Sequence, residues 1–68
     1  MNSYNVVIQD IYEKEKQKHV SVSAQNAQLA HKAGLRHTSA LREEISLVKD
    51  SKNNVVFTFK DGFVEVDE

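Results

Sequence analysis

Cysteine and proline are absent from the 68-residue sequence. Without cysteine, neither a disulfide nor a zinc site with thiolate ligands can form. A chain this short buries only about 60% of the surface that its unfolded form exposes, so the margin of stability of its fold is thin. Because small domains without such cross-links are commonly stabilised by association, we predict one domain over residues 1–68 that forms a homo-oligomer.

Long apolar runs are also missing. The longest one near the N-terminus is Val6-Val7-Ile8, which is far shorter than the core of a signal peptide or a membrane span. No basic segment precedes it. The sequence therefore predicts a cytoplasmic protein without a membrane partner.

The usual enzyme motifs do not occur. The two glycines, Gly34 and Gly62, are too far apart to form a phosphate-binding loop, and no cysteine can act as a nucleophile. Glu43 and Glu44 are adjacent, so in a helix their side chains would point about 100° apart, which does not suit a general acid and base. We predict no enzymatic activity, no catalytic residue, no cofactor and no small-molecule substrate.

The histidines do not form a metal-binding motif. His19, His31 and His37 are separated by twelve and six residues, whereas a helix that binds zinc places two histidines four residues apart. We predict that they are solvated or cap turns, and we predict no metal site.

The charges are distributed unevenly, although the formal net charge is only −1. Residues 14–42 contain six lysines and arginines and one acid, and residues 43–68 contain three lysines and seven acids. A basic middle segment can face phosphates, or it can face the acidic C-terminal part of another subunit. The charge pattern leaves both alternatives open.

Apolar spacing predicts three short helices. Tyr4, Val7, Ile8, Ile11 and Tyr12 recur at helical spacing and indicate a first helix over about 3–18.

The second helix is expected over about 24–33, with Ser21 or Ser23 as its cap and Gly34 as the residue that ends it. Leu41, Ile45 and Val48 indicate a third helix over about 38–50.

The C-terminal segment, VVFTFKDGFVEV, predicts a β-hairpin over about 54–67. A two-residue turn at Asp61-Gly62 would pair Phe59 with Val64, and a three-residue turn at 60–62 would pair Phe59 with Phe63. The first register separates apolar from polar residues more cleanly, so we favour it. The predicted fold class is α+β, with three short helices followed by a C-terminal β-hairpin.

Residues 28–47 carry the one resemblance to a known family, and its motif is Leu-Ala-His-Lys-Ala-Gly-Leu at 29–35. The segment resembles the first helix and turn of helix-turn-helix DNA-binding proteins, with Ala30 at the tightly packed position, Gly34 in the turn and Leu35 buried after it. The following segment departs from the family pattern, because Leu41 and Ile45 fall one position late. With the hairpin added, the arrangement is similar to a winged helix.

The resemblance implies a small dimeric transcriptional regulator whose partner is duplex DNA. Arginine can bind guanine in the major groove, and hydroxyl groups at a helix start can bind phosphates. The residues expected to contact nucleic acid are Lys32, Arg36, His37, Thr38, Ser39, Arg42 and Lys60.

The alternative is a non-catalytic protein that forms homo-oligomers or binds a partner protein, with no role in nucleic-acid binding. In the favoured hairpin register Phe63 lies on the face away from the core, so an aromatic residue there suggests a covered surface. In this alternative the interface is formed by Phe57, Phe59 and Phe63 together with the apolar stripe of the first helix. The residues named as its site are Tyr4, Ile8, Ile11 and Phe63.

Overall fold

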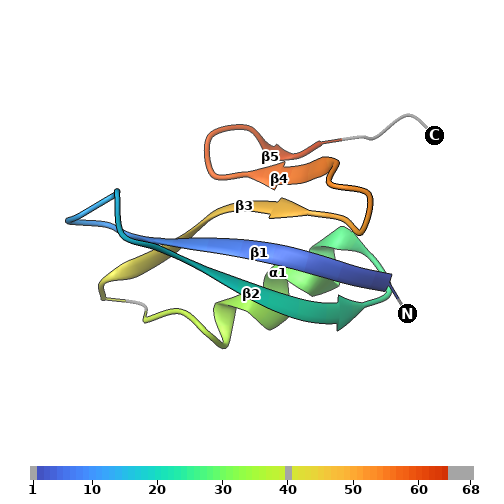
Figure 1. Ribbon diagram of the computed structural model, residues 1–68, viewed down its shortest axis with the longest axis horizontal. Helices are drawn as coiled ribbons and strands as arrows, with labels where there is room; N and C mark the ends of the chain where they lie inside the picture. Colours follow the sequence, from blue (N-terminus) through green and yellow to red (C-terminus); the bar gives the residue numbers. More distant parts are fainter. Residues whose placement is uncertain (1, 40, 65–68) are drawn as a thin grey trace.

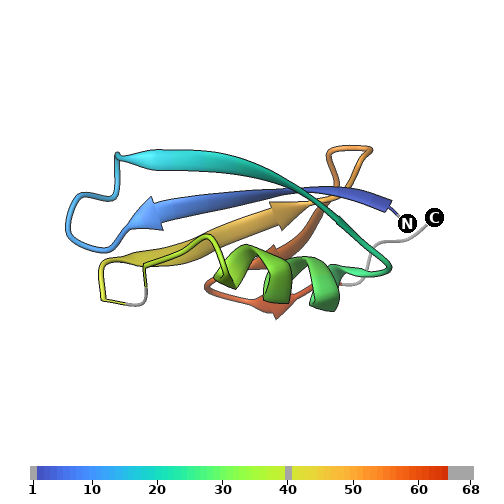
Figure 2. The same cartoon turned by 90° about the horizontal axis from the view of Figure 1, so that it is seen from below.

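A computed structural model describes residues 2–39 and 41–64 of the chain. Within those residues the chain forms a five-stranded antiparallel sheet with one α-helix on one of its faces (Figures 1 and 2). The elements are β1 (Asn2–Asp10), β2 (Gln17–Ala24), α1 (Ala27–Leu35), β3 (Glu43–Lys49), β4 (Val55–Thr58) and β5 (Gly62–Phe63). The predicted fold class of three helices followed by a hairpin is therefore wrong.

The strand order across the sheet is β2-β1-β3-β4-β5. Both β2 and β3 are antiparallel to β1, so they run in the same direction on either side of it. Helix α1 connects them and crosses one face of the sheet (Figure 2). This crossover places the core between α1 and the sheet.

The predicted helix over 3–18 is instead the β1–β2 hairpin. Tyr4, Val6 and Ile8 alternate toward the core, which is the period of a strand. Val7 lies on the opposite face and is still only 5% exposed, because β1 is flanked by a strand on each side. A strand that is buried on both faces gives a continuous apolar run, and that run also satisfied the helical spacing.

The turn between β1 and β2 lies in a charged segment that was expected to be part of the first helix. Asp10 Oδ1 accepts hydrogen bonds from the backbone N–H groups of Tyr12 and Glu13, at 2.8 Å and 2.9 Å. Such a side-chain-to-backbone turn competes with helix formation. The chain therefore reverses direction after Asp10.

The predicted third helix, over 38–50, is a turn followed by β3. Its apolar spacing has a specific cause, which is a β-bulge in β3. Val7 pairs with Leu47 and Ile8 pairs with Ile45, so Ser46 has no pairing partner on β1. The extra residue turns Ile45 and Val48 toward the same core although they are three residues apart. The bulge thus gives the buried residues of a strand the spacing that is typical of a helix.

Helix α1 confirms the predicted second helix, with shifted ends. Its N-cap is Asn26, whose side chain accepts a hydrogen bond from the Leu29 N–H at 2.9 Å. Gly34 lies inside the helix and does not end it. A Cβ at Gly34 would lie 2.8 Å from Cγ1 of Val6 and 3.2 Å from Cδ1 of Ile45, so glycine lets α1 approach the sheet closely.

The C-terminal hairpin is present in the described residues, but neither predicted register is correct. Phe57 pairs with Phe63 and Thr58 pairs with Gly62, so the turn is formed by residues 59–61. Gly62 has a positive φ of 77°, a conformation that glycine adopts without strain. The rest of the predicted hairpin, from residue 65 onward, lies outside the described residues.

One apolar core fills the space between α1 and the sheet. Ile8, Val6 and Val48 are its largest fully buried side chains. Its remaining buried members, all less than 9% exposed, are Tyr4, Ala24, Ala30, Ile45 and Val56.

Candidate functional site

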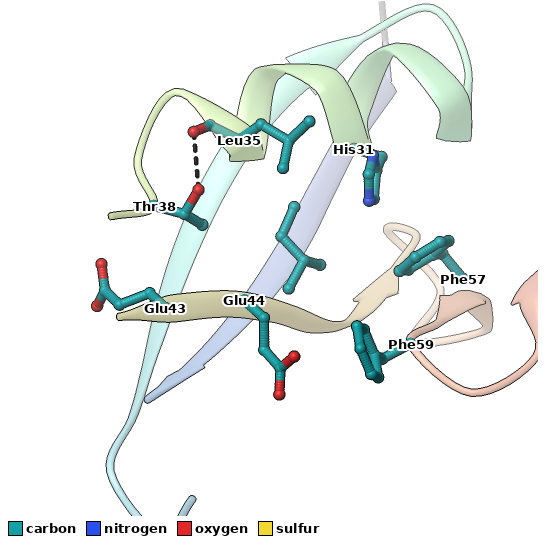
Figure 3. A pocket seen from close by; sticks show the side chains of 8 residues that line it. His31, Leu35, Thr38, Glu43, Glu44, Phe57 and Phe59 are labelled. Atoms are coloured by element: carbon teal, nitrogen blue, oxygen red, sulfur yellow. Dashed lines mark hydrogen bonds between the residues drawn. The ribbon is translucent and has the colours of Figure 1, made fainter. Parts of the chain in front are cut away.

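A groove lies between α1, β3 and β4 (Figure 3). Its volume is about 550 Å³, which is in the range of ordinary ligand sites. We call it the α1–β3–β4 groove. It is lined by His31, Leu35, Thr38, Glu43, Glu44, Ile45, Phe57 and Phe59.

Three rings pack together at the end of the groove nearest β4. The ring centroids of His31 and Phe57 are 4.4 Å apart, those of Phe57 and Phe63 are 5.0 Å apart, and those of His31 and Phe63 are 5.7 Å apart. Tilted and edge-on pairs at such distances are favourable. These rings connect α1 with β4 and β5.

His31 is half-buried among these rings, and the loss of solvation lowers its pKa from the ordinary value. The imidazole is therefore neutral at pH 7. A neutral imidazole offers one hydrogen-bond donor and one acceptor to a bound group.

Two large apolar side chains of the groove are exposed to solvent. Phe59 is 64% exposed and Leu35 is 51% exposed. Phe59 follows β4, and its backbone N–H donates a hydrogen bond to the carbonyl oxygen of Ser46 in β3 at 2.9 Å, so the main chain that carries the ring is held in place. An apolar surface on rigid elements is the kind of surface that a partner covers.

Two carboxylates lie at the start of β3. Glu43 accepts a hydrogen bond from the backbone N–H of Ser39 at 2.9 Å and another from Lys18 Nζ at 3.3 Å. The hydrogen bond from Ser39 is the largest cause of the lowered pKa of Glu43. Glu44 accepts a hydrogen bond from Gln9 Nε2 at 2.8 Å, and among the described residues it has no salt bridge. Glu44 therefore leaves a negative charge at the groove without a cationic partner there.

The orientation of the two carboxylates differs. Figure 3 shows the Glu44 carboxylate on the same side as the ring of Phe59, whereas the Glu43 carboxylate points away from that ring. Helix α1 also ends at Leu35 beside the groove, and the C-terminal end of a helix carries a partial negative charge. The groove thus combines apolar side chains with the negative charge of Glu44.

One of the residues predicted to bind nucleic acid, Arg42, forms contacts within the chain. Arg42 donates a hydrogen bond to Asp10 Oδ2 at 2.9 Å, and its guanidinium carbon lies 5.9 Å from the centroid of the Tyr12 ring. The Arg42 contact is the largest of the causes that lower the pKa of Asp10 to about 2. Arg42 is therefore engaged within the chain.

Two other residues that were predicted to bind nucleic acid form hydrogen bonds in the turn after α1. The Thr38 hydroxyl donates to the carbonyl oxygen of Leu35 at 2.8 Å, and the Ser39 N–H donates to Glu43. The four remaining residues are exposed: Lys32 on α1, Arg36 and His37 after it, and Lys60 in the β4–β5 turn. The expected recognition helix is absent, because residues 43–49 form β3.

The predicted interface residues have different environments. Tyr4 and Ile8 are 8% and 0% exposed in the chain's own core, so their side chains are not available to a partner. Ile11 is half-buried just after β1, and Phe63 is 46% exposed beside Phe57 and His31. Of the four, Phe63 contributes most to an accessible apolar surface.

The groove itself was not predicted from the sequence. Phe57 and Phe59 were noted as part of a hairpin, but His31 on α1 and Glu44 on β3 gave no sign that they would meet them. The one local signal was the closely spaced set of phenylalanines in a chain with only three of them. The rest of the groove comes from the crossover of α1.

No group of three or more potential metal ligands occurs among residues 2–39 and 41–64. In the same residues, no helix is long and apolar enough to cross a membrane. Comparison with protein-family models, with curated proteins and with solved structures finds no match for the chain.

Proposed function

We propose that the protein is a non-catalytic binding module, and that its α1–β3–β4 groove takes an apolar peptide segment of a partner protein that carries one cationic side chain. The observation that supports this function is the exposure of two large apolar side chains of the groove, Phe59 and Leu35, together with the carboxylate of Glu44 on the same side as Phe59. A cytoplasmic location remains a prediction from the sequence.

The apolar part of the partner is argued from exposure. Burial of a phenylalanine or leucine side chain stabilises a complex by about 1.5–3 kcal/mol, and aromatic anchors in a pocket often dominate the affinity of an interface. In the free protein more than half of the surface of Phe59 and of Leu35 is exposed to solvent, so this area is available for burial by a partner. A peptide side chain placed between them would cover both.

The cationic part of the partner is argued from charge. Glu44 has no salt bridge among the described residues, and it lies on the same side as Phe59. An arginine can bind a carboxylate through two parallel hydrogen bonds and stack on an aromatic ring at the same time. This combination favours arginine over lysine in the partner.

The binding of duplex DNA by Lys32, Arg36, His37 and Lys60 stays a prediction from the sequence. Any such binding would rest on phosphate contacts, because the chain has no second helix after α1 in its described residues. Its affinity would therefore fall steeply as the salt concentration rises.

A peptide titration followed by amide chemical shifts tests the proposed function. The probe is a short capped peptide in which one arginine is flanked by leucine and phenylalanine, and its twin has citrulline in place of the arginine. We expect shifts that are confined to the groove and weaker binding of the citrulline peptide.

Variants make this test sharper. Phe59→Ala is expected to weaken binding of the arginine peptide about tenfold or more. Glu44→Gln is expected to weaken it about threefold, as for a partly exposed charge pair, and to leave the citrulline peptide unaffected. Glu15→Gln, which changes an exposed acid in the β1–β2 turn, is the matched control. Equal binding of both peptides by the unmodified protein would contradict the role of Glu44, and shifts outside the groove would contradict the site.

A further inference from the structure

The outer edge of β2 is the second surface of interest, and it lies on the side of the sheet opposite to β4. The Asp10 N–H donates to the Lys16 carbonyl oxygen at 3.1 Å, just beyond the paired residues Gln9 and Gln17. In an antiparallel pair, hydrogen-bonded and non-hydrogen-bonded positions alternate. Continuing the alternation along β2 directs the main-chain N–H and C=O groups of its odd-numbered residues away from β1. These residues are Gln17, His19, Ser21 and Ser23.

Apart from one lysine, this edge lacks the usual features that prevent a strand from pairing with another chain. Natural edge strands are commonly short, bulged, interrupted by proline or lined with charges. β2 has eight residues, no proline and a continuous register with β1, and its one charged residue is Lys18. By contrast, β5 at the other edge of the described sheet has two residues.

Apolar side chains accompany the free main-chain edge. Val20 and Val22 point to the helix side and are only half-buried against the core. Leu29 of α1 is 44% exposed. Leu29 and His31 lie on opposite flanks of α1, because they stand on either side of the buried Ala30 in the helix. His31 contacts Phe57 of β4, so Leu29 lies on the flank that faces β2.

We propose that β2 pairs with β2 of a second copy of this chain, antiparallel and with the two-fold axis at Val20, so that the two sheets form one continuous sheet. In this register His19 lies opposite Ser21 of the partner subunit, and Gln17 lies opposite Ser23 of the partner subunit. All four outward residues of each strand are then used, which gives about eight inter-chain hydrogen bonds.

The side chains are compatible with self-pairing in this register. Lys18 lies opposite Val22 of the partner subunit, so no two lysines are directly opposed. Because paired residues share a face, both α1 helices lie on the same side, and Val20, Val22 and Leu29 of both copies line the space between them. The association supplies the stabilisation that a chain of 68 residues without cysteine lacks. It leaves the α1–β3–β4 groove open, so it does not depend on the proposed peptide binding.

Single cysteine variants test the register, because the protein has no cysteine of its own. Val20 meets itself across the axis at a non-hydrogen-bonded position, where the Cα atoms of antiparallel strands are about 4.5 Å apart, which a disulfide spans. We expect Val20→Cys to form a disulfide-linked dimer under mild oxidation. Ser23→Cys is the control, because the more exposed residue 23 lies far from its own copy in this register. Equal cross-linking of both variants would overturn the proposed pairing.

Sedimentation equilibrium tests the assembly without a cross-link. The unmodified protein is expected to be a dimer, and Ser21→Pro, which removes an outward N–H group, is expected to be a monomer with an unchanged circular dichroism spectrum. A monomeric unmodified protein at the concentrations used for NMR would overturn the proposal. So would a Ser21→Pro variant that is folded and still dimeric.

Discussion

The two sides of α1 meet the sheet in different ways. On the side over β1 and β3, Ala30 and Gly34 lie directly on the strands, and there is no room for one more carbon atom at Gly34. On the side toward β4, the rings of His31 and Phe57 connect the helix with the strand, and a groove remains. We call these the close side and the open side.

The difference shows how side-chain size separates stability from binding in a small protein. Small residues on the close side allow the dense packing that a thin core needs. Large rings on the open side cannot interdigitate as closely, so they leave apolar area exposed. This short chain therefore supports its fold with one side of its helix and leaves apolar side chains exposed on the other side.

The largest expected effect is on the close side. Gly34→Ala places a Cβ 2.8 Å from Cγ1 of the fully buried Val6, so we expect a loss of about 1–3 kcal/mol in the free energy of unfolding, even though alanine is the better helix former. Urea denaturation measures the loss. In a double variant, Val6→Ala makes room for the added methyl group, so the two losses are expected to be less than additive. Full additivity would contradict the contact.

A smaller effect is expected from the rings of the open side. Phe57→Ala removes a half-buried ring that contacts both His31 and Phe63, and we expect it to cost about 1–2 kcal/mol, less than a fully buried phenylalanine. Thermal denaturation measures this loss. A loss as large as that for a fully buried core residue would show that the open side stabilises the fold as much as the close side does.

The pH dependence of stability distinguishes His31 from an exposed histidine. Burial lowers the pKa of His31, so the unfolded chain binds the proton more readily than the folded one. The stability that His31 contributes is therefore complete above pH 6.5 and falls as the pH drops below that value. We expect His31→Phe to reduce this fall in denaturation measurements at pH 5–7, while His37→Phe, which alters an exposed residue, leaves it unchanged. An identical pH profile for His31→Phe would contradict the desolvation of this ring.

The smallest effect on stability is expected at Phe59. Its ring is 64% exposed, so Phe59→Ala should change the free energy of unfolding by less than about 0.5 kcal/mol. The same variant is expected to lose binding of the arginine peptide. A large loss of stability would place Phe59 in the core and remove the main support for the groove as a binding site.

Part of the fold was accessible from local sequence signals. A helix was expected over about 24–33 because small apolar residues recur there, and the structure has it at Ala27–Leu35. A turn near Asp61-Gly62 was expected because these residues favour one. The two false helices have a common cause. Val7 is buried on the second face of a central strand, and the bulge at Ser46 brings Ile45 and Val48 to one face, so both segments satisfied helical spacing.

The candidate site was less accessible. Phe57 and Phe59 are close in sequence, but His31 and Glu44 reach the same groove from α1 and β3. Glu43 and Glu44 were taken as adjacent helical residues, whereas in β3 they point in different directions and only Glu44 lies beside Phe59. Arg42 was expected to contact a ligand. In the structure it pairs instead with Asp10 at the end of β1.

The sequence by itself determined that the chain has no cysteine to cross-link it, where its apolar segments lie, and which segment has the composition of a helix. The tertiary structure decided which other segments became strands, because neighbouring strands supply burial and hydrogen bonds that no local pattern contains. It also decided the groove, because the crossover of α1 sets His31 against a phenylalanine 26 positions later in the chain.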